Sequence, residues 1–220
     1  MQPMDEALTR VRDLLRIFGK RIGTRVPADL EEDLDWFAAL LDQALSWHAL
    51  QEVLAEAAGD SGKLKGVSKQ AQDQALTARA SVREALMQPR YTGLVLALET
   101  VLQKPLQTDK QTEALGRFAP RRLNKQRNRI LMRAGGDIAS LSTKELRKLA
   151  VSLREFHLLQ QIALPCLGEK KARALVKATG KLAKAVKRSL FNAELTIRLS
   201  AIEKPDAAKQ ALRKLQRKRQ

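Results

Sequence analysis

The chain has 220 residues, of which 44% are hydrophobic, 30% are charged and 4% are aromatic. This length and composition suffice to bury a hydrophobic core and argue against an intrinsically disordered chain. The low aromatic content argues against a β-sandwich and against a stacking surface for single-stranded nucleic acid. Because Cys166 is the only cysteine, no intrachain disulfide can form, and a reducing, cytoplasmic setting is expected.

No segment of the sequence is predicted to cross a membrane. The most apolar stretch, residues 91–102, is too short for a span and carries Glu99. The first six residues are acidic and no apolar core follows them, so no signal peptide is expected. Because Met1 falls almost inside the first predicted helix, an excised or truncated module is expected, and in that case an upstream domain could carry an enzyme activity.

The formal net charge of +17 is distributed unevenly along the chain. Residues 1–100 hold 12 Lys/Arg and 15 Asp/Glu, whereas residues 101–220 hold 29 Lys/Arg and 9 Asp/Glu. The second part must therefore repel itself unless an anion relieves the repulsion. This asymmetry indicates a polyanionic partner.

Apolar residues recur every three or four positions through almost the whole chain, which predicts an all-α fold. The sequence Ser142-Thr143-Lys144-Glu145 predicts a capping box at the start of one helix, and Gly135-Gly136 should end the helix before it. Pro120 lies inside that preceding helix or marks its true start. The first expected helix has its apolar face at 8–22 and ends at Gly23, and the second is capped by Asp29 with its apolar face at 30–41. Further helices are expected at about 47–58, 69–87, 91–102, 112–134 and 169–189. One more begins at the Ser142 cap and ends before Pro165, and a last one begins near Pro205.

One predicted helix carries a continuous basic ridge with spacings of three and four residues. Its members are Lys170, Arg173, Lys177, Lys181, Lys184 and Arg188. Leu175, Thr179, Leu182, Val186 and Leu190 recur on the opposite side and are expected to face the core. An ordinary solvated lysine face interleaves glutamates, but no acidic residue lies between Lys170 and Glu194. Because like charges at this spacing cost stability, the ridge favours anion binding over simple solvation.

Three further basic sets lie on other predicted helices. Taken singly, each is more typical of a surface than of a binding site, but together they make a shared anion groove plausible. The sets are Arg122, Lys125, Arg129 and Arg133; Arg147, Arg154 and His157, across from a stripe of Leu146, Leu149, Leu153 and Phe156; and Arg10, Arg12, Arg16, Lys20 and Arg21.

The sequence offers little support for catalysis or for a metal site. His48 and His157 are the only histidines and are far apart in sequence. His48, beside Trp47, is expected to pack at a helix start, whereas His157 lies next to a basic set and is a candidate phosphate contact. No Gly-rich phosphate loop, aspartate pair or nucleophile–base arrangement is recognised in the sequence. We therefore expect no enzyme activity, no metal and no cofactor.

Several short sequence stretches, in the same order as in that family, resemble the CHAD superfamily, the "conserved histidine α-helical domain". The best stretch runs from Ala78 to Leu86 and continues through residues 88–98. The likeness extends to residues 118–133, to Leu141-Ser142 and to 146–149. It also covers the end of the first repeat, at Ala44 and Trp47. The matching positions of the first helix are Met4, Ala7, Leu8, Arg10, Val11, Arg12 and Phe18. Gln2 and Arg147 stand where the family has its signature histidines, and Asp5, Thr9, Ala150 and Glu155 replace basic positions of the motif. A basic side chain is kept at Arg10, Arg12 and Arg154 and, with changed type, at Arg147 and His157.

The chain is thus similar to a divergent member, like the degenerate CHAD-like region of bacterial CYTH-domain triphosphatases. The resemblance implies one domain, 1–220, made of two four-helix repeats, 1–106 and 107–220, around a basic groove. It also implies polyphosphate binding without catalysis. From the resemblance and the basic sets together, the predicted contacts are Arg10, Arg12, Arg16, Lys20, Arg122, Lys125, Arg129, Arg147, Arg154, His157, Lys177, Lys181, Lys184 and Arg188.

Inorganic polyphosphate is the favoured ligand, because a flexible polyanion without bases needs many Lys and Arg donors and no stacking aromatics. A cytoplasmic protein associated with polyphosphate granules is then expected. Two alternatives remain open. One is nonspecific binding of duplex nucleic acid through counterion release. The other is a regulatory domain of a triphosphatase, in which the basic face senses substrate or product.

Overall fold

The computed structural model describes most of the chain, and every structural statement below concerns that part. The described residues are 1–19, 28–58, 65–103, 115–135, 138–166, 169–200 and 202. Seven α-helices and two short 3-10 helices follow one another there, and no strand occurs among these residues. The all-α prediction is confirmed. No helix in the described part of the chain is long and apolar enough to cross a membrane.

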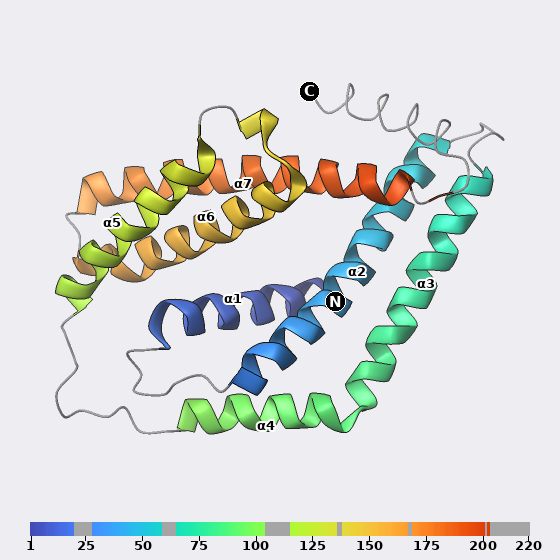
Figure 1. The fold of residues 1–220 in the computed structure, drawn as a ribbon, viewed down its shortest axis with the longest axis horizontal. Helices are drawn as coiled ribbons and strands as arrows, with labels where there is room; N and C mark the ends of the chain where they lie inside the picture. Colours follow the sequence, from blue (N-terminus) through green and yellow to red (C-terminus); the bar gives the residue numbers. More distant parts are fainter. Residues whose placement is uncertain are drawn as a thin grey trace. The chain divides into compact units, whose positions relative to one another are not determined.

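The helices follow the chain in a simple order, shown in Figure 1. Their bounds are α1 (Gln2–Phe18), α2 (Ala28–Ala58), α3 (Lys65–Met87), α4 (Pro89–Gln103), α5 (Leu115–Ala134), η2 (Ile138–Ser140), α6 (Thr143–Ala163), η3 (Leu164–Cys166) and α7 (Glu169–Ser200). The helix expected near Pro205 lies outside the described residues.

Several helix boundaries differ from those expected from sequence, and α1 ends at Phe18 although its apolar pattern continues to Ile22. Residues 28–58 form one helix instead of two, because nothing between Leu41 and Trp47 breaks the helical hydrogen bonding, and His48 is therefore not at a helix start. α3 begins at Lys65, so Gly66 lies inside it, although the sequence predicted a helix start near residue 69. α7 continues past residue 189 to Ser200.

α5 follows the sequence signals. Pro120 lies inside α5, where its missing N–H removes one helical hydrogen bond. Gly135 ends α5 in the left-handed conformation, with φ of 51°, and its N–H donates to the Leu131 carbonyl at 3.2 Å. The expected helix stop at Gly135 is therefore confirmed.

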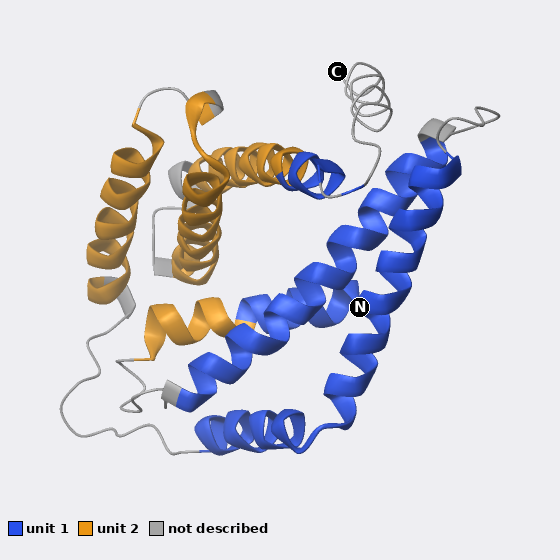
Figure 2. Ribbon diagram, turned by 45° about the vertical axis from the view of Figure 1, so that its right-hand side comes forward, with its two compact units in different colours: residues 1–10, 26–103, 194–220 blue, residues 11–25, 104–193 orange. Residues whose placement is uncertain are grey.

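The chain divides into two compact units, coloured in Figure 2. Unit 1 comprises Met1–Arg10, Val26–Gln103 and Glu194–Gln220, and unit 2 comprises Val11–Arg25 and Lys104–Ala193. The units concentrate the charge: unit 2 holds 26 Lys/Arg against 7 Asp/Glu, whereas unit 1 holds 15 against 17. The basic unit thus includes the second half of α1. The proposed division into repeats 1–106 and 107–220 stays a prediction.

Unit 1 is built on the long helix α2, which packs against α3 and α4. Its buried side carries large side chains, of which Leu34, Phe37, Leu41 and Leu50 are 2% exposed or less. The facing side of α3 is mostly alanine, which lets the two backbones approach closely. The buried residues of α3 are Val67, Ala71, Ala75, Ala78, Val82 and Ala85. Packing of large residues against small ones defines this helix pair.

The start of α4 is fixed to α2 by charge and by aromatic packing within unit 1. Arg90 Nε donates to Asp33 Oδ1 at 2.6 Å, and its guanidinium lies 4.5 Å from the centre of the Trp36 ring. The rings of Tyr91 and Phe37 pack 4.9 Å apart. The acidic start of α2 therefore has a structural role for at least one of its carboxylates.

Unit 2 has its core between α5, α6, α7 and the second half of α1. Ile130 of α5, Val186 of α7 and the α6 residues Leu149, Leu153 and Phe156 form one buried cluster. A second cluster joins Ile17 of α1 to Leu158 and Leu159 of α6, beside an aromatic contact of 5.6 Å between Phe18 and Phe118. α6 therefore contacts all three other helices of this basic unit.

Candidate anion-binding site

α6 begins with the predicted capping box. The Ser142 hydroxyl accepts from the Glu145 N–H at 3.3 Å, and Glu145 Oε2 accepts from the Ser142 N–H at 2.8 Å and from its hydroxyl at 2.6 Å. These bonds favour the ionised carboxylate, so the Ser142 hydroxyl, followed by its N–H, lowers the pKa of Glu145 below its usual value. The cap fixes where α6 starts and hence the register of its basic side chains.

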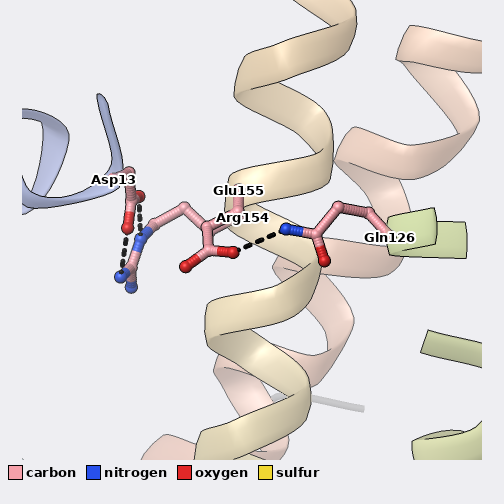
Figure 3. Close-up of polar contacts among 4 residues, drawn as sticks. All are labelled: Asp13, Gln126, Arg154 and Glu155. Carbon is pink, nitrogen blue, oxygen red and sulfur yellow. Dashed lines mark hydrogen bonds and ion pairs between the residues drawn. The ribbon is translucent and has the colours of Figure 1, made fainter. Parts of the chain in front are cut away.

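Two adjacent residues of α6 make polar contacts with different helices of unit 2 (Figure 3). Arg154 Nε donates to Asp13 Oδ2 of α1 at 2.5 Å, and Arg154 Nη2 donates to Oδ1 at 3.0 Å. Glu155 Oε2 accepts from Gln126 Nε2 of α5 at 2.7 Å. Asp13, Gln126 and Glu155 are all buried. These pairs hold α6 in a defined orientation between α1 and α5.

His157 lies against α7. A Cβ on Gly180 would lie 3.2 Å from the ring Cε1, so the glycine allows the ring to approach the α7 backbone. His157 Nε2 lies 3.2 Å from Gln161 Nε2, while Nδ1 is buried and has no hydrogen-bond partner among the described residues. Gly180 lies three residues after Lys177 and four before Lys184, so both lysines are neighbours of the ring contact on the surface of α7.

Arg147, Arg154 and His157 share one side of α6, because they are spaced by seven and three residues. We call these three residues the α6 basic face. Arg154 contacts α1 and His157 contacts α7, so this face lies on the side of α6 that runs between those two helices of unit 2. Arg147 is exposed and Arg154 and His157 are half-buried. The sequence predicted all three as anion contacts, and the structure brings them to one helix face.

The lysines of α7 are exposed. Lys177, Lys181 and Lys184, which we call the α7 lysine row, make no hydrogen bond or ion pair with any described part of the chain. Arg188 continues the row and is also exposed. Lys170 lies in the first turn of α7, but its side chain is not among those described. The row therefore presents free ammonium groups on the surface of the basic unit.

The expected core-facing stripe of α7 is only partly correct. Thr179 and Val186 are buried and Leu190 is half-buried, as expected, but Leu175 is 51% exposed and Leu182 is 40% exposed. Gly180 contacts His157 of α6, and Ala183 packs against the buried cluster that includes Leu153, so these positions lie on the covered side instead of Leu175 and Leu182. The lysine row nevertheless lies away from the buried side.

The remaining predicted contacts fall into different environments. Lys125 and Arg129 of α5 are exposed and, within the described part, have no partner. Arg122 instead donates from Nη2 to the Arg16 carbonyl at 3.2 Å, which ties α5 to α1. Arg133, which was outside the predicted contacts but in the same basic set, donates to the Lys148 carbonyl at 3.1 Å and to Ser152 Oγ.

Not all predicted contacts belong to unit 2. Arg12 and Arg16 do, whereas Arg10 is exposed and lies in unit 1. Lys20 lies outside the described residues. The described residues contain no group of three or more His, Cys, Asp or Glu placed to hold a metal ion. The basic groove itself stays a prediction.

The sequence did not predict the residues that contact side chains of α6 from other helices of unit 2. Asp13, Gln126 and Gly180 gave no signal as functional residues, because each acts through a residue on another helix. A signal existed for Asp13 alone. It is the only acidic residue among the second-half residues of α1 and stands among Arg12 and Arg16, which is unusual for a helix that contributes to a basic unit.

The fold and the site together define an all-α protein with a strongly basic unit whose lysines are exposed. The family model for the CHAD domain matches residues 2–218, which is nearly the whole chain, so the chain belongs to the CHAD domain family. No curated protein and no solved structure gives a significant match. The family assignment expected from the sequence is confirmed.

Proposed function

We propose that this protein binds inorganic polyphosphate through unit 2, without chemical turnover. The α7 lysine row carries the proposal: three ammonium groups on one helix face have no partner within the described chain, in a unit with 26 Lys/Arg against 7 Asp/Glu. A polyanion relieves the repulsion among these charges, and a long one contacts several of them at once. Membership of the CHAD domain family supports the same ligand.

The α6 basic face supports the proposal with donors of a different kind. Arg147 and Arg154 supply planar guanidinium groups, which match phosphate oxygens in pairs, whereas the lysine row supplies point charges. His157 adds a ring beside Gly180 and the row. The arginine and lysine groups bind phosphate oxygens through charge and spacing, which suits a ligand that has no bases.

On this proposal the protein acts as a binding module. The expected residence at polyphosphate granules follows from the ligand, and the alternative role as regulatory domain of a triphosphatase uses the same basic face. Incubation with polyphosphate and magnesium should release no phosphate after rigorous repurification. Steady release would contradict the non-catalytic part of the proposal.

A competition experiment tests the ligand. Labelled long-chain polyphosphate bound to the protein is challenged with unlabelled polyphosphate, duplex DNA or RNA at physiological salt, with each competitor at the same concentration of phosphate groups. We expect displacement by polyphosphate at much lower concentrations than by either nucleic acid. Equal displacement by duplex DNA would indicate nonspecific binding through counterion release instead.

Thermal unfolding supplies a second test, because a ligand that binds only the folded state raises the melting temperature. We expect long-chain polyphosphate to raise it far more than monophosphate at equal phosphorus. The reason is that one long chain spans several cationic groups. Equal stabilisation by both would point to ionic screening without a site.

A further inference from the structure

Asp13 is an unusual residue in the basic unit. Its side chain is 1% exposed, and it accepts both hydrogen bonds that Arg154 offers from Nε and Nη2. A buried carboxylate is costly unless it is paired and hydrogen-bonded, and this arrangement meets both conditions. The Arg154 side chain is 41% exposed, so the same guanidinium has one side inside the protein and another accessible to solvent.

The geometry leaves Arg154 with donors to spare. A guanidinium has five N–H donors in a fixed plane, and Asp13 uses one on Nε and one on Nη2. One hydrogen of Nη1 and the second hydrogen of Nη2 form the other edge, and no described group accepts from them or from the remaining Nη1 hydrogen. This edge is the pair of nitrogens that binds a phosphate group through two parallel hydrogen bonds.

Asp13 also determines where that edge lies. An unrestrained arginine side chain samples many rotamers, and ordering it on binding costs entropy. The two hydrogen bonds to a buried carboxylate fix both the position and the plane of the guanidinium before any ligand arrives. Ordering is thus completed during folding, and the affinity of the preorganised donor for an anion is higher.

We propose that Asp13 is a positioning residue of the anion site, which orients Arg154 so that its free edge binds a phosphate group of the ligand. This inference rests on the proposed function and adds a role for an acidic residue within it. If net charge alone governed binding, the negative charge of Asp13 would weaken polyanion binding. The two views therefore predict effects of opposite sign when the charge of Asp13 is removed.

The test is a titration of long-chain polyphosphate into the wild-type protein, Asp13→Asn and Glu6→Gln. Asparagine keeps the shape of Asp13 but has only one oxygen acceptor, so it cannot hold both Arg154 nitrogens. Glu6 is exposed on the same helix, so Glu6→Gln is the matched control for loss of one negative charge. We expect several-fold weaker binding by Asp13→Asn, with unchanged or slightly tighter binding by Glu6→Gln. Binding by Asp13→Asn as tight as wild type, or tighter, overturns the proposal.

Two further measurements separate positioning from a structural role. The slope of log affinity against log salt concentration should become shallower in Asp13→Asn, by the amount expected for loss of about one phosphate contact. In an Arg154→Gln background, Asp13→Asn should have no further effect on affinity, whereas a general loss of structure would lower affinity again. Absence of polyphosphate binding by the wild-type protein would refute the proposed function itself, which is a different outcome from equal binding by wild type and Asp13→Asn.

A second variant keeps the proposal testable where Asp13→Asn fails to fold, as judged by its helical circular dichroism at the assay temperature. Arg154→Lys preserves the net charge and can still form an ion pair with Asp13, but an ammonium group has no second edge. We expect the same several-fold loss of affinity. Wild-type affinity in a folded Arg154→Lys protein overturns the proposal.

Discussion

The imidazole ring of His157 lies against the backbone of Gly180, where a methyl group would be 3.2 Å from Cε1 and 3.6 Å from Nε2. A contact of 3.2 Å is closer than ordinary van der Waals packing, so the ring would have to move to admit a side chain. Glycine inside a helix costs about 1 kcal/mol relative to alanine. The ring contact gives a physical reason for glycine in the middle of α7.

We expect Gly180→Ala to stabilise the protein by clearly less than the ~1 kcal/mol of helix propensity, because displacement of the His157 ring offsets part of the gain. In a His157→Ala background the obstacle is gone, and the full gain should return. Urea denaturation of wild type, Gly180→Ala, His157→Ala and the double variant measures the coupling energy between the two positions. An identical effect of Gly180→Ala in both backgrounds would show that the ring contact has no energetic weight.

The helical fold was predictable because apolar spacing and capping residues are local signals. The capping box at Ser142 and the stop at Gly135 are both confirmed, since each depends on residues within one turn. The break expected before Trp47 was wrong. The buried residues Leu41, Ala44, Trp47 and Leu50 continue at three-residue spacing across this point, and α2 has no helix-breaking residue there.

The contacts that hold the site were not predictable, because periodicity assigns a residue to a helix face but not to a partner. Asp13 and Arg154 are 141 positions apart, and Gln126 and Glu155 are 29 apart. Leu175 and Leu182 show the same limit. Both fit an apolar stripe in the sequence, yet both side chains are exposed in the structure. Which face is covered depends on the packing of several helices together.

The buried hydrogen bond between Gln126 and Glu155 predicts a large effect of removing one partner. Gln126→Met should destabilise the protein by about 1–3 kcal/mol, because it leaves the carboxylate of Glu155 buried without the donor at 2.7 Å. Replacement of both residues by Met should recover most of this loss. Chemical denaturation of the single and double variants measures it. A double variant as unstable as the single one would show that the lost hydrogen bond was not the cause.

Ser142→Ala should cost about 1 kcal/mol of stability at neutral pH, because it removes a helix N-cap. The bonds from Ser142 lower the pKa of Glu145 from its usual 4.5, so their contribution is complete above that pH and is lost as the pH falls through the lower folded-state pKa. The difference between wild type and Ser142→Ala should therefore shrink in acid. Thermal melts across this range provide the measurement, and a difference independent of pH would exclude a role for the Glu145 carboxylate.

The α7 lysine row allows the most specific prediction about the ligand. The triple variant Lys177→Glu, Lys181→Glu and Lys184→Glu should lose polyphosphate binding while keeping its helical circular dichroism. All three side chains are exposed and lie away from buried Thr179 and Val186, so the core is not altered. Each substitution removes a cationic donor and adds repulsion, and a hydrogen bond to a charged group contributes about 1.5–3 kcal/mol. Isothermal titration with long-chain polyphosphate gives the affinity.

The matched control reverses three exposed basic residues of α3 in unit 1: Lys65→Glu, Lys69→Glu and Arg83→Glu. This variant has the same change in net charge, so long-range attraction to a polyanion falls by a similar amount. A local site on unit 2 predicts a small loss of affinity in the control and a complete loss in the α7 variant. Equal losses would mean that net charge alone governs binding, and the lysine row would then be an ordinary solvated face.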